Sequence, residues 1–191
     1  MKKLATLSTL LLACQSGPRD SIGWEERWEV LVLTEYGNIL DARMVVGNRE
    51  LLRGQGRVHM DHWSAVSMSV NHTRELAPGD VSIDPHGGGI QLGLDRLFRE
   101  DIWTLQIGSM DANLMLELTP DSPTPSPQSW QPSGGQWSMA APVSGANVLG
   151  WLEAGGRGGR FRGRGVVLHR GGDGRPSLPR EAVFVVAKNI W

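Results

Sequence analysis

Residues 155–172 read GGRGGRFRGRGVVLHRGG, and two different structures are compatible with this stretch. Alternating arginine and glycine are typical of RNA-binding segments, which also interleave aromatic side chains with the basic ones. The alternative is the turn and second strand of a β-hairpin, because Leu149–Glu153 and Phe161–His169 both read as strands. In that hairpin, alternate residues from Phe161 to His169 share a face, and the strand glycines mark a barrel corner or a close backbone approach.

The charge balance of the chain favours the β-hairpin over an RNA-binding segment. The 191 residues include 19 basic and 20 acidic side chains, a net charge of −1. Without residues 1–13, which hold two lysines, the balance is 17 to 20. An acidic chain is not a nucleic-acid binder by bulk charge, and Phe161 is the only aromatic residue in the stretch. We therefore expect no nucleic-acid partner.

The N-terminus predicts export and a lipid anchor. Two lysines precede Leu4–Ala13, an apolar run that is too short for a membrane span of about 20 residues but suits a secretory signal. The run ends in LLAC and resembles a bacterial lipobox whose lipidated residue is Cys14, the only cysteine. We expect a signal peptide at 1–13 and a tether at 14–23. The resemblance to Gram-negative lipoproteins implies attachment to the outer membrane on its periplasmic side, because Gln15 and not an aspartate follows the cysteine. A plain signal peptide with an incidental cysteine is the alternative.

The rest of the chain predicts an all-β domain. Short runs rich in apolar and β-branched residues alternate with turn signals. The expected strands are 27–35, 39–46, 56–71 (one long strand), 81–83, 90–94, 102–107, 112–118, 146–153, 161–169 and 182–190. The proline-rich residues 119–135 read as an exposed loop, and the only helical feature is a turn at 95–101. About eight to ten short strands predict a single antiparallel β-barrel or sandwich over residues 24–191.

Several motifs resemble one known family. Their order matches the lipocalin-like domain of the carotenoid 1,2-hydratase, AttH and yeast survival-factor (Svf) family over most of residues 24–191. The matching stretches are WEERW (24–28) before Tyr36-Gly37, residues 48–58, Trp103 to Pro120, and PVSG (142–145) followed by GWL (150–152) and FRGRGVVLHRGG (161–172).

The resemblance implies a β-barrel with a cavity for a lipid, isoprenoid or other hydrophobic small molecule. The family includes a hydratase, cyclases and lipid carriers, so fold alone does not select among these activities. Two departures weaken a transfer of catalysis. The family commonly has two such domains where this chain has one, and the aromatic residue that usually follows the histidine is missing after His169.

Three residues are candidates for acid catalysis. Adding water to an isolated double bond, as the hydratase relatives do, needs a general acid in an apolar pocket. His169 occupies the family's histidine position, and Asp61 and Glu153 are the carboxylates we consider. A strand-end histidine bonded to backbone is the alternative reading of His169.

No cofactor or metal is expected. In His59-Met60-Asp61-His62 the two histidines point to opposite faces of a strand, and His59 with Asp61 supplies only two ligands. The glycine-rich stretch lacks the lysine and the following helix of a phosphate-binding loop, and no nucleophile elbow is present.

Large apolar side chains are the candidates for binding a ligand. They either line a cavity or fill the barrel, which is just wide enough for both outcomes. The candidates are Trp28, Trp63, Trp103, Trp151, Phe161 and Met60. The sequence thus predicts a membrane-anchored periplasmic lipoprotein that binds or carries a hydrophobic small molecule. The alternatives are a hydratase or cyclase acting on an isoprenoid, and a structural envelope lipoprotein without ligand.

Overall fold

The computed structural model describes residues 24–47, 55–64, 70–84, 88–122 and 138–173. The expected signal peptide, Cys14, the tether, most of the proline-rich loop and the strand at 182–190 lie outside these residues. The described chain forms eleven antiparallel strands in one sheet, in the order β4-β3-β2-β1-β11-β10-β9-β8-β7-β6-β5. The predicted all-β antiparallel barrel is confirmed.

The strand bounds are as follows. The first part of the chain gives β1 (Trp24–Thr34), β2 (Ile39–Gly47), β3 (Gln55–Trp63) and β4 (Val70–Leu76). A short 3-10 turn, Pro78–Asp80, leads to β5 (Val81–Ile83), β6 (Gly89–Leu92), β7 (Asp95–Arg99), β8 (Trp103–Gly108) and β9 (Ala112–Pro120). The two longest strands close the series: β10 (Ser138–Ala154) and β11 (Arg157–Asp173).

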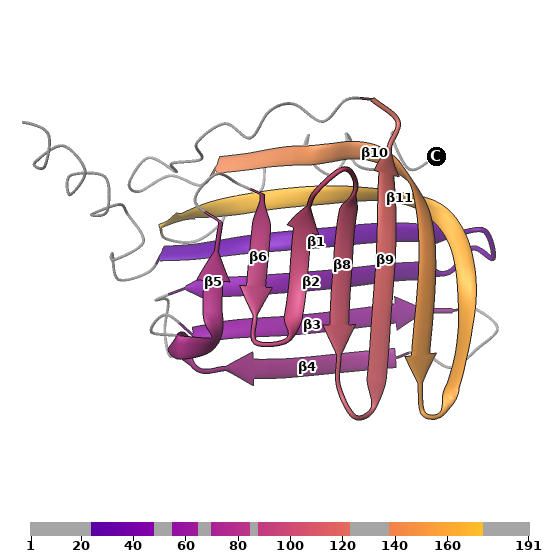
Figure 1. The fold of residues 1–191 in the computed structure, drawn as a ribbon, viewed down its shortest axis with the longest axis horizontal. Helices are drawn as coiled ribbons and strands as arrows, with labels where there is room; N and C mark the ends of the chain where they lie inside the picture. Colours follow the sequence, from indigo (N-terminus) through magenta and orange to yellow (C-terminus); the bar gives the residue numbers. More distant parts are fainter. Residues whose placement is uncertain (1–23, 48–54, 65–69, 85–87, 123–137, 174–191) are drawn as a thin grey trace, which may run out of the picture.

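The long hairpin of β10 and β11 joins two layers. In Figure 1 β1–β4 run horizontally behind β5–β9, which run vertically, and β10 and β11 bend from one direction into the other. Register shifts between Ala140 and Val143 and between Val143 and Ala146 interrupt the β10–β11 ladder, and such bulges increase local bending and twist. The two layers therefore pack at a steep angle around one core, the orthogonal arrangement of small barrels.

The glycines of residues 155–172 allow the neighbouring strands to approach closely. A Cβ added at Gly163 would lie 2.4 Å from the carbonyl oxygen of Leu33 on β1, and one at Gly165 would lie 2.8 Å from Val148. Gly155 and Gly156 have φ angles of 56° and 73° and form the β10–β11 turn. The arginine-glycine stretch is therefore a β-hairpin, as its alternation predicts.

The two edges of the sheet meet through side chains. Arg74 on β4 donates Nη2 to Asp95 on β7 and Nη1 to the carbonyl of Gly108 (3.0 Å) on β8. Asp95 is completely buried, and its Oδ1 accepts the N–H of Gly108 at 2.9 Å. On the other side, a Cβ at Gly56 of β3 would touch Leu92 of β6 at 2.8 Å. These contacts nearly close the barrel although β4 and β5 share no ladder.

Three of the predicted elements are wrong in detail. Residues 56–71 are not one strand, because β3 ends at Trp63 and β4 begins at Val70, and the two pair with each other. Residues 95–101 hold no helical turn, since Asp95–Arg99 is β7, paired with both β6 and β8. The proline-rich loop does not begin at residue 119, because β9 extends to Pro120 opposite Ala146.

Candidate functional site

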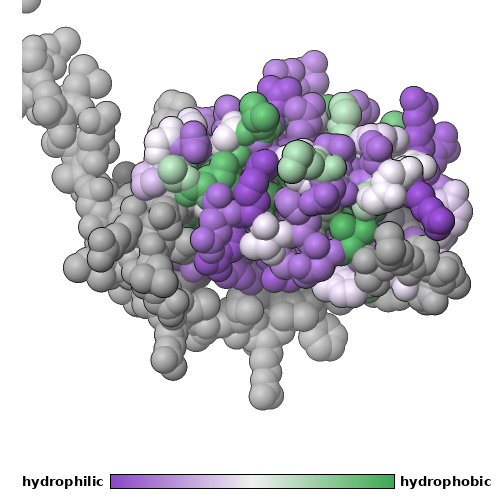
Figure 2. Space-filling model, turned by 90° about the horizontal axis from the view of Figure 1, so that it is seen from below, coloured by the Kyte–Doolittle hydropathy of each residue, from purple (hydrophilic) through white to green (hydrophobic). Residues whose placement is uncertain are grey.

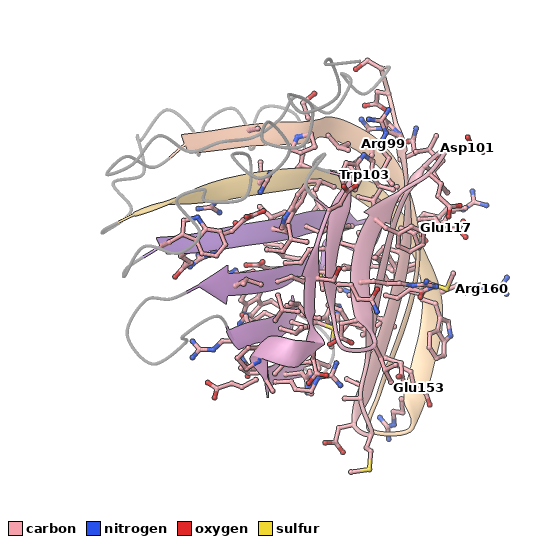
Figure 3. All side chains as sticks on the ribbon, turned by 60° about the vertical axis from the view of Figure 1, so that its left-hand side comes forward. Arg99, Asp101, Trp103, Glu117, Glu153 and Arg160 are labelled. Carbon is pink, nitrogen blue, oxygen red and sulfur yellow. The ribbon has the colours of Figure 1, made fainter. Side chains whose placement is uncertain are left out.

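The barrel interior is filled around its two central tryptophans. Trp28 and Trp103 expose 1% of their surface, and their rings lie 5.8 Å apart, one from each layer. Figure 3 shows Trp103 between the layers. Met44, Met60, Leu105 and Leu116 expose 1% or less. A side chain that lined a water-sized void would have accessible surface, so these residues fill the centre of the barrel.

A buried polar pair lies within this apolar interior. His169 on β11 stacks on Trp28, with ring centroids 3.8 Å apart, because the two residues are directly opposed in the β1–β11 ladder. Its Nε2 lies 2.8 Å from Oε1 of Glu26, two residues before Trp28 on the same face of β1. His169 and Glu26 each expose 5% of their surface. A carboxylate accepts from an N–H, so the contact favours the Nε2–H tautomer of His169.

Two indole groups next to this pair are unsatisfied. Nε1 of Trp28 and Nε1 of Trp103 are buried and have no hydrogen-bond partner among the described residues. An unpaired buried donor costs about 1–3 kcal/mol. The interior thus combines a buried acid-base pair with two open donors, the elements of a polar subsite, beside two tryptophans that each expose only 1% of their surface.

The other two acid candidates lie far from His169. Asp61 faces outward from β3, where its Oδ2 accepts from Nε2 of His59 and its Oδ1 accepts from Nδ2 of Asn71, both at 2.6 Å. Nδ1 of His59 is 2.6 Å from the Thr73 hydroxyl. Glu153 lies at the end of β10, and Figure 3 shows it on the outward side of the sheet. The structure therefore brings none of the three candidates together.

The described residues form no candidate metal site. No group of three or more His, Cys, Asp or Glu gathers within residues 24–47, 55–64, 70–84, 88–122 and 138–173. His59 and His62 face opposite sides of β3: His59 bonds outward to Asp61, whereas His62 shares the inward face with Met60. Burial lowers the pKa of His62 below its usual value.

The predicted ligand-binding residues divide into two sets. Trp28, Trp103 and Met60 point inward and belong to the filled core. Trp63 and Trp151 point outward and remain partly exposed, on β3 and β10 respectively. Phe161 belongs with the inward set: it is half-buried against the core, and its ring covers Gly150, where an added Cβ would lie 2.2 Å from Cζ.

Trp151 belongs to a groove of about 850 Å³ on the outer surface of β9, β10 and β11. We call this the outer groove. Its apolar floor consists of Trp151, Leu149 and Met115, which expose 37%, 55% and 41% of their surface. Trp151 and Met115 are direct partners in the β9–β10 ladder. Three adjacent half-exposed apolar side chains in a concavity are typical of a binding site.

Charged side chains surround this floor. Arg160 and Arg162 project from the same face of β11, opposite Trp151 and Leu149, and Glu117 lies opposite Leu149 on β9. Glu35, from the β1–β2 turn, accepts the backbone N–H of Arg162 at 3.2 Å and donates its own N–H to the Arg162 carbonyl at 2.8 Å. In Figure 3 Glu117 and Arg160 extend from the outward side of the sheet.

Ile39 and Trp63, which expose 49% and 45% of their surface, are direct partners in the β2–β3 ladder and form a second exposed apolar pair. Other exposed apolar side chains lie at turns. Leu94 and Met110 are almost fully exposed at the β6–β7 and β8–β9 turns. Figure 2, which looks at the molecule from below, shows separate hydrophobic patches among hydrophilic side chains. No helix in the described part of the chain is long and apolar enough to cross a membrane. The outer groove combines exposed apolar surface with a concave shape.

Sequence reasoning missed several residues of both sites. Glu26 is absent from the candidates because its contact with His169 spans 143 positions. Leu149, Met115, Arg160 and Arg162 are absent from the six predicted ligand-binding residues, although strand alternation puts Arg160 and Arg162 on the face opposite to Phe161 and His169.

Comparison with known proteins identifies the fold and leaves the activity open. No protein-family profile and no curated protein matches the sequence. Among solved structures, a protein provisionally identified as AttH from Nitrosomonas europaea matches with a TM-score of 0.50 and 13% identity over 89% of this chain and 55% of its own. CghA matches with 11% identity over 79% of this chain and 46% of its own, at a TM-score of 0.56 with Sch210972 and 0.52 without. The chain thus spans about half the length of these proteins and shares their β-barrel fold.

Proposed function

We propose that this protein binds a hydrophobic small molecule without chemical turnover, and that the ligand occupies the outer groove. The observation that carries the proposal is the contrast between a filled interior and a groove whose floor leaves Trp151, Leu149 and Met115 partly exposed. CghA, which shares the fold, has been crystallised with Sch210972.

The groove offers enough apolar surface for moderate affinity. Completing the burial of a half-exposed large side chain contributes about 1 kcal/mol, so three side chains and the matching ligand surface contribute about 6 kcal/mol. That free energy corresponds to a dissociation constant of tens of micromolar, and the cost of immobilising the ligand weakens it. Such affinity suits a carrier that must also release its ligand.

The proposal includes the location of the protein. We propose that Cys14 carries lipid and holds the barrel at the periplasmic side of the outer membrane, as its lipobox-like context suggests. Acyl chains contribute about 0.8 kcal/mol per buried CH₂, so a multiply acylated cysteine is a firm anchor. Growth with a radiolabelled fatty acid tests this point: label in the wild-type protein and none in Cys14→Ser is the expected result.

Mass spectrometry of the intact, detergent-solubilised protein from a lipid-containing host tests ligand binding. We expect a co-purifying small molecule in the wild type and in Trp63→Ser, whose residue is similarly exposed on β3, outside the groove. The double variant Leu149→Ser/Trp151→Ser should lose it. Retention in all three proteins would exclude the groove as the site, and a bare wild-type protein that takes up no added lipid would favour a structural role without ligand.

A second function rests on the buried His169–Glu26 pair. A histidine bonded to a carboxylate in an apolar interior has the composition of the general acid that a hydratase or cyclase needs. For this function the barrel must open to admit substrate, because His169 and Glu26 each expose only 5% of their surface and Trp28 and Trp103 only 1%. Loss of isoprenoid turnover in His169→Ala with retained ligand would support it; a ligand recovered unchanged after long incubation would not.

A further inference from the structure

We infer that the ligand of the outer groove is an anionic amphiphile whose charged end binds Arg160 and Arg162 while its apolar chain lies over Trp151 and Met115. This inference rests on the proposed function, because it names the chemical class that the same groove selects. Its basis is the order of residue types across the three strands that form the groove floor.

Arg160 and Arg162 lie close together on β11 and can both bind a charged ligand. They are two residues apart on β11, about 7 Å along the strand, on the same outward face. Neither guanidinium makes an ion pair within the described residues. The next outward arginine, Arg164, is by contrast bound to Asp121 and to Asn147 (2.9 Å). Arg170, further along the strand, is bound to Glu29.

Apolar side chains continue directly from the arginines. The β10–β11 ladder places Trp151 opposite Arg160, and the β9–β10 ladder places Met115 opposite Trp151. Charge, aromatic ring and thioether therefore follow one another across three neighbouring strands, a span of about 10 Å. A chain that begins with an anion at Arg160 has a continuous apolar path across the sheet.

The acidic residues of the groove leave the arginine end positive. Glu35, whose Oε1 accepts the N–H of Arg162, adds one negative charge at the β11 side, where Arg160 and Arg162 carry two positive charges. Glu117 lies beyond Leu149, two strands and about 10 Å from Arg162. The groove is thus positive along β11 and negative toward β9, which orients an anionic ligand with its charged end on β11.

Arginine suits this role chemically. Its planar guanidinium binds carboxylate or phosphate oxygens with two parallel hydrogen bonds and remains charged at every relevant pH. The neighbouring Trp151 and Leu149 exclude water from one side of the pair, which strengthens the attraction relative to a fully solvated one. Selectivity for an anion should consequently weaken as salt rises.

Calorimetric titration of the full-length protein with three surfactants of identical chain, each below its micelle concentration, tests the inference. Dodecanoate should bind at least about tenfold more tightly than dodecyl maltoside, and dodecyltrimethylammonium more weakly still. The double variant Arg160→Gln/Arg162→Gln should bind dodecanoate and dodecyl maltoside equally. Arg96→Gln, outside the groove on β7, should retain the wild-type preference.

The outcomes separate this inference from the proposed function. Equal affinity of the wild type for all three surfactants would overturn the anionic class and leave hydrophobic binding intact. Binding of none would overturn both. Binding to phosphatidylglycerol vesicles in a flotation assay without binding of soluble dodecanoate would identify a membrane-docking surface and overturn the inference of a single-molecule site.

Discussion

Replacing Asp95 by alanine should open the edge of the barrel. Asp95 is completely buried and accepts hydrogen bonds from the Arg74 guanidinium and from the Gly108 N–H (2.9 Å). These contacts join β4 to β7 and β8, although β4 has no ladder partner on that side. The variant leaves both donors without this acceptor at the seam between the two layers.

The expected loss of stability is large for one side chain. Removing one partner of a buried ion pair costs about 3–5 kcal/mol, and we take the lower end because the Arg74 side chain is 31% exposed and water can reach it. A loss of about 3 kcal/mol lowers the melting temperature of a domain of this size by roughly 6–12 °C. Urea unfolding at neutral pH measures the same difference as a shift in midpoint.

The neighbouring Arg57–Glu75 pair provides a matched control. It joins β3 to β4, the strand that also carries Arg74, with 2.9 Å between its charged atoms, but both side chains are largely exposed. Glu75→Ala should cost about 0.5 kcal/mol or less. Equal destabilisation by Asp95→Ala and Glu75→Ala would refute the reasoning that a buried carboxylate closes the barrel.

Three further predictions concern backbone approach, pH and the interior. Gly163→Ala should destabilise the protein by about 1–3 kcal/mol in urea unfolding, because the added Cβ would lie 2.4 Å from the Leu33 carbonyl oxygen. The control Gly159→Ala should be almost neutral, because nothing lies within 4 Å of its added Cβ. A neutral Gly163→Ala would contradict the close approach of β11 to β1. Burial lowers the pKa of His62 in the folded state, so the unfolded chain binds the proton more readily and the folded protein loses stability as the pH drops below about 6.5. His62→Gln should therefore reduce the difference between the urea midpoints at pH 7.5 and pH 5.5. An unchanged difference would exclude this contribution. His169→Phe should keep the stacking on Trp28 but remove the 2.8 Å contact with Glu26, which should lower the free energy of unfolding by about 2 kcal/mol or more. A variant as stable as the wild type would show that the buried Glu26 carboxylate does not need His169.

The sequence predicts the architecture well because a strand repeats every two residues. The alternation predicts that Phe161 and His169 share a face, and the structure shows this to be the inward face, where His169 stacks on Trp28. The charge balance separates the glycine-rich stretch from RNA-binding segments. The break between β3 and β4 is hidden because residues 56–71 continue in apolar and polar alternation through it.

The site was less predictable for two physical reasons. The contact between Glu26 and His169 depends on the pairing of the first strand with the last, which no local pattern reveals. In β10 both faces carry apolar residues, Leu149 and Trp151 on one and Val148 and Leu152 on the other, so hydrophobicity alone does not say which face is buried. Only the packing of Val148 into the core settles that Trp151 points outward.

Fluorine NMR of the protein labelled with 5-fluorotryptophan tests the central claim most directly. Single Trp→Phe variants assign the resonances of Trp28, Trp103 and Trp151, which report on the interior and on the outer groove in one spectrum. On addition of dodecanoate, our account predicts that the Trp151 resonance shifts with saturation while those of Trp28 and Trp103 stay in place. Movement of Trp28 and Trp103 with an unchanged Trp151 would place the ligand inside the barrel and contradict the account.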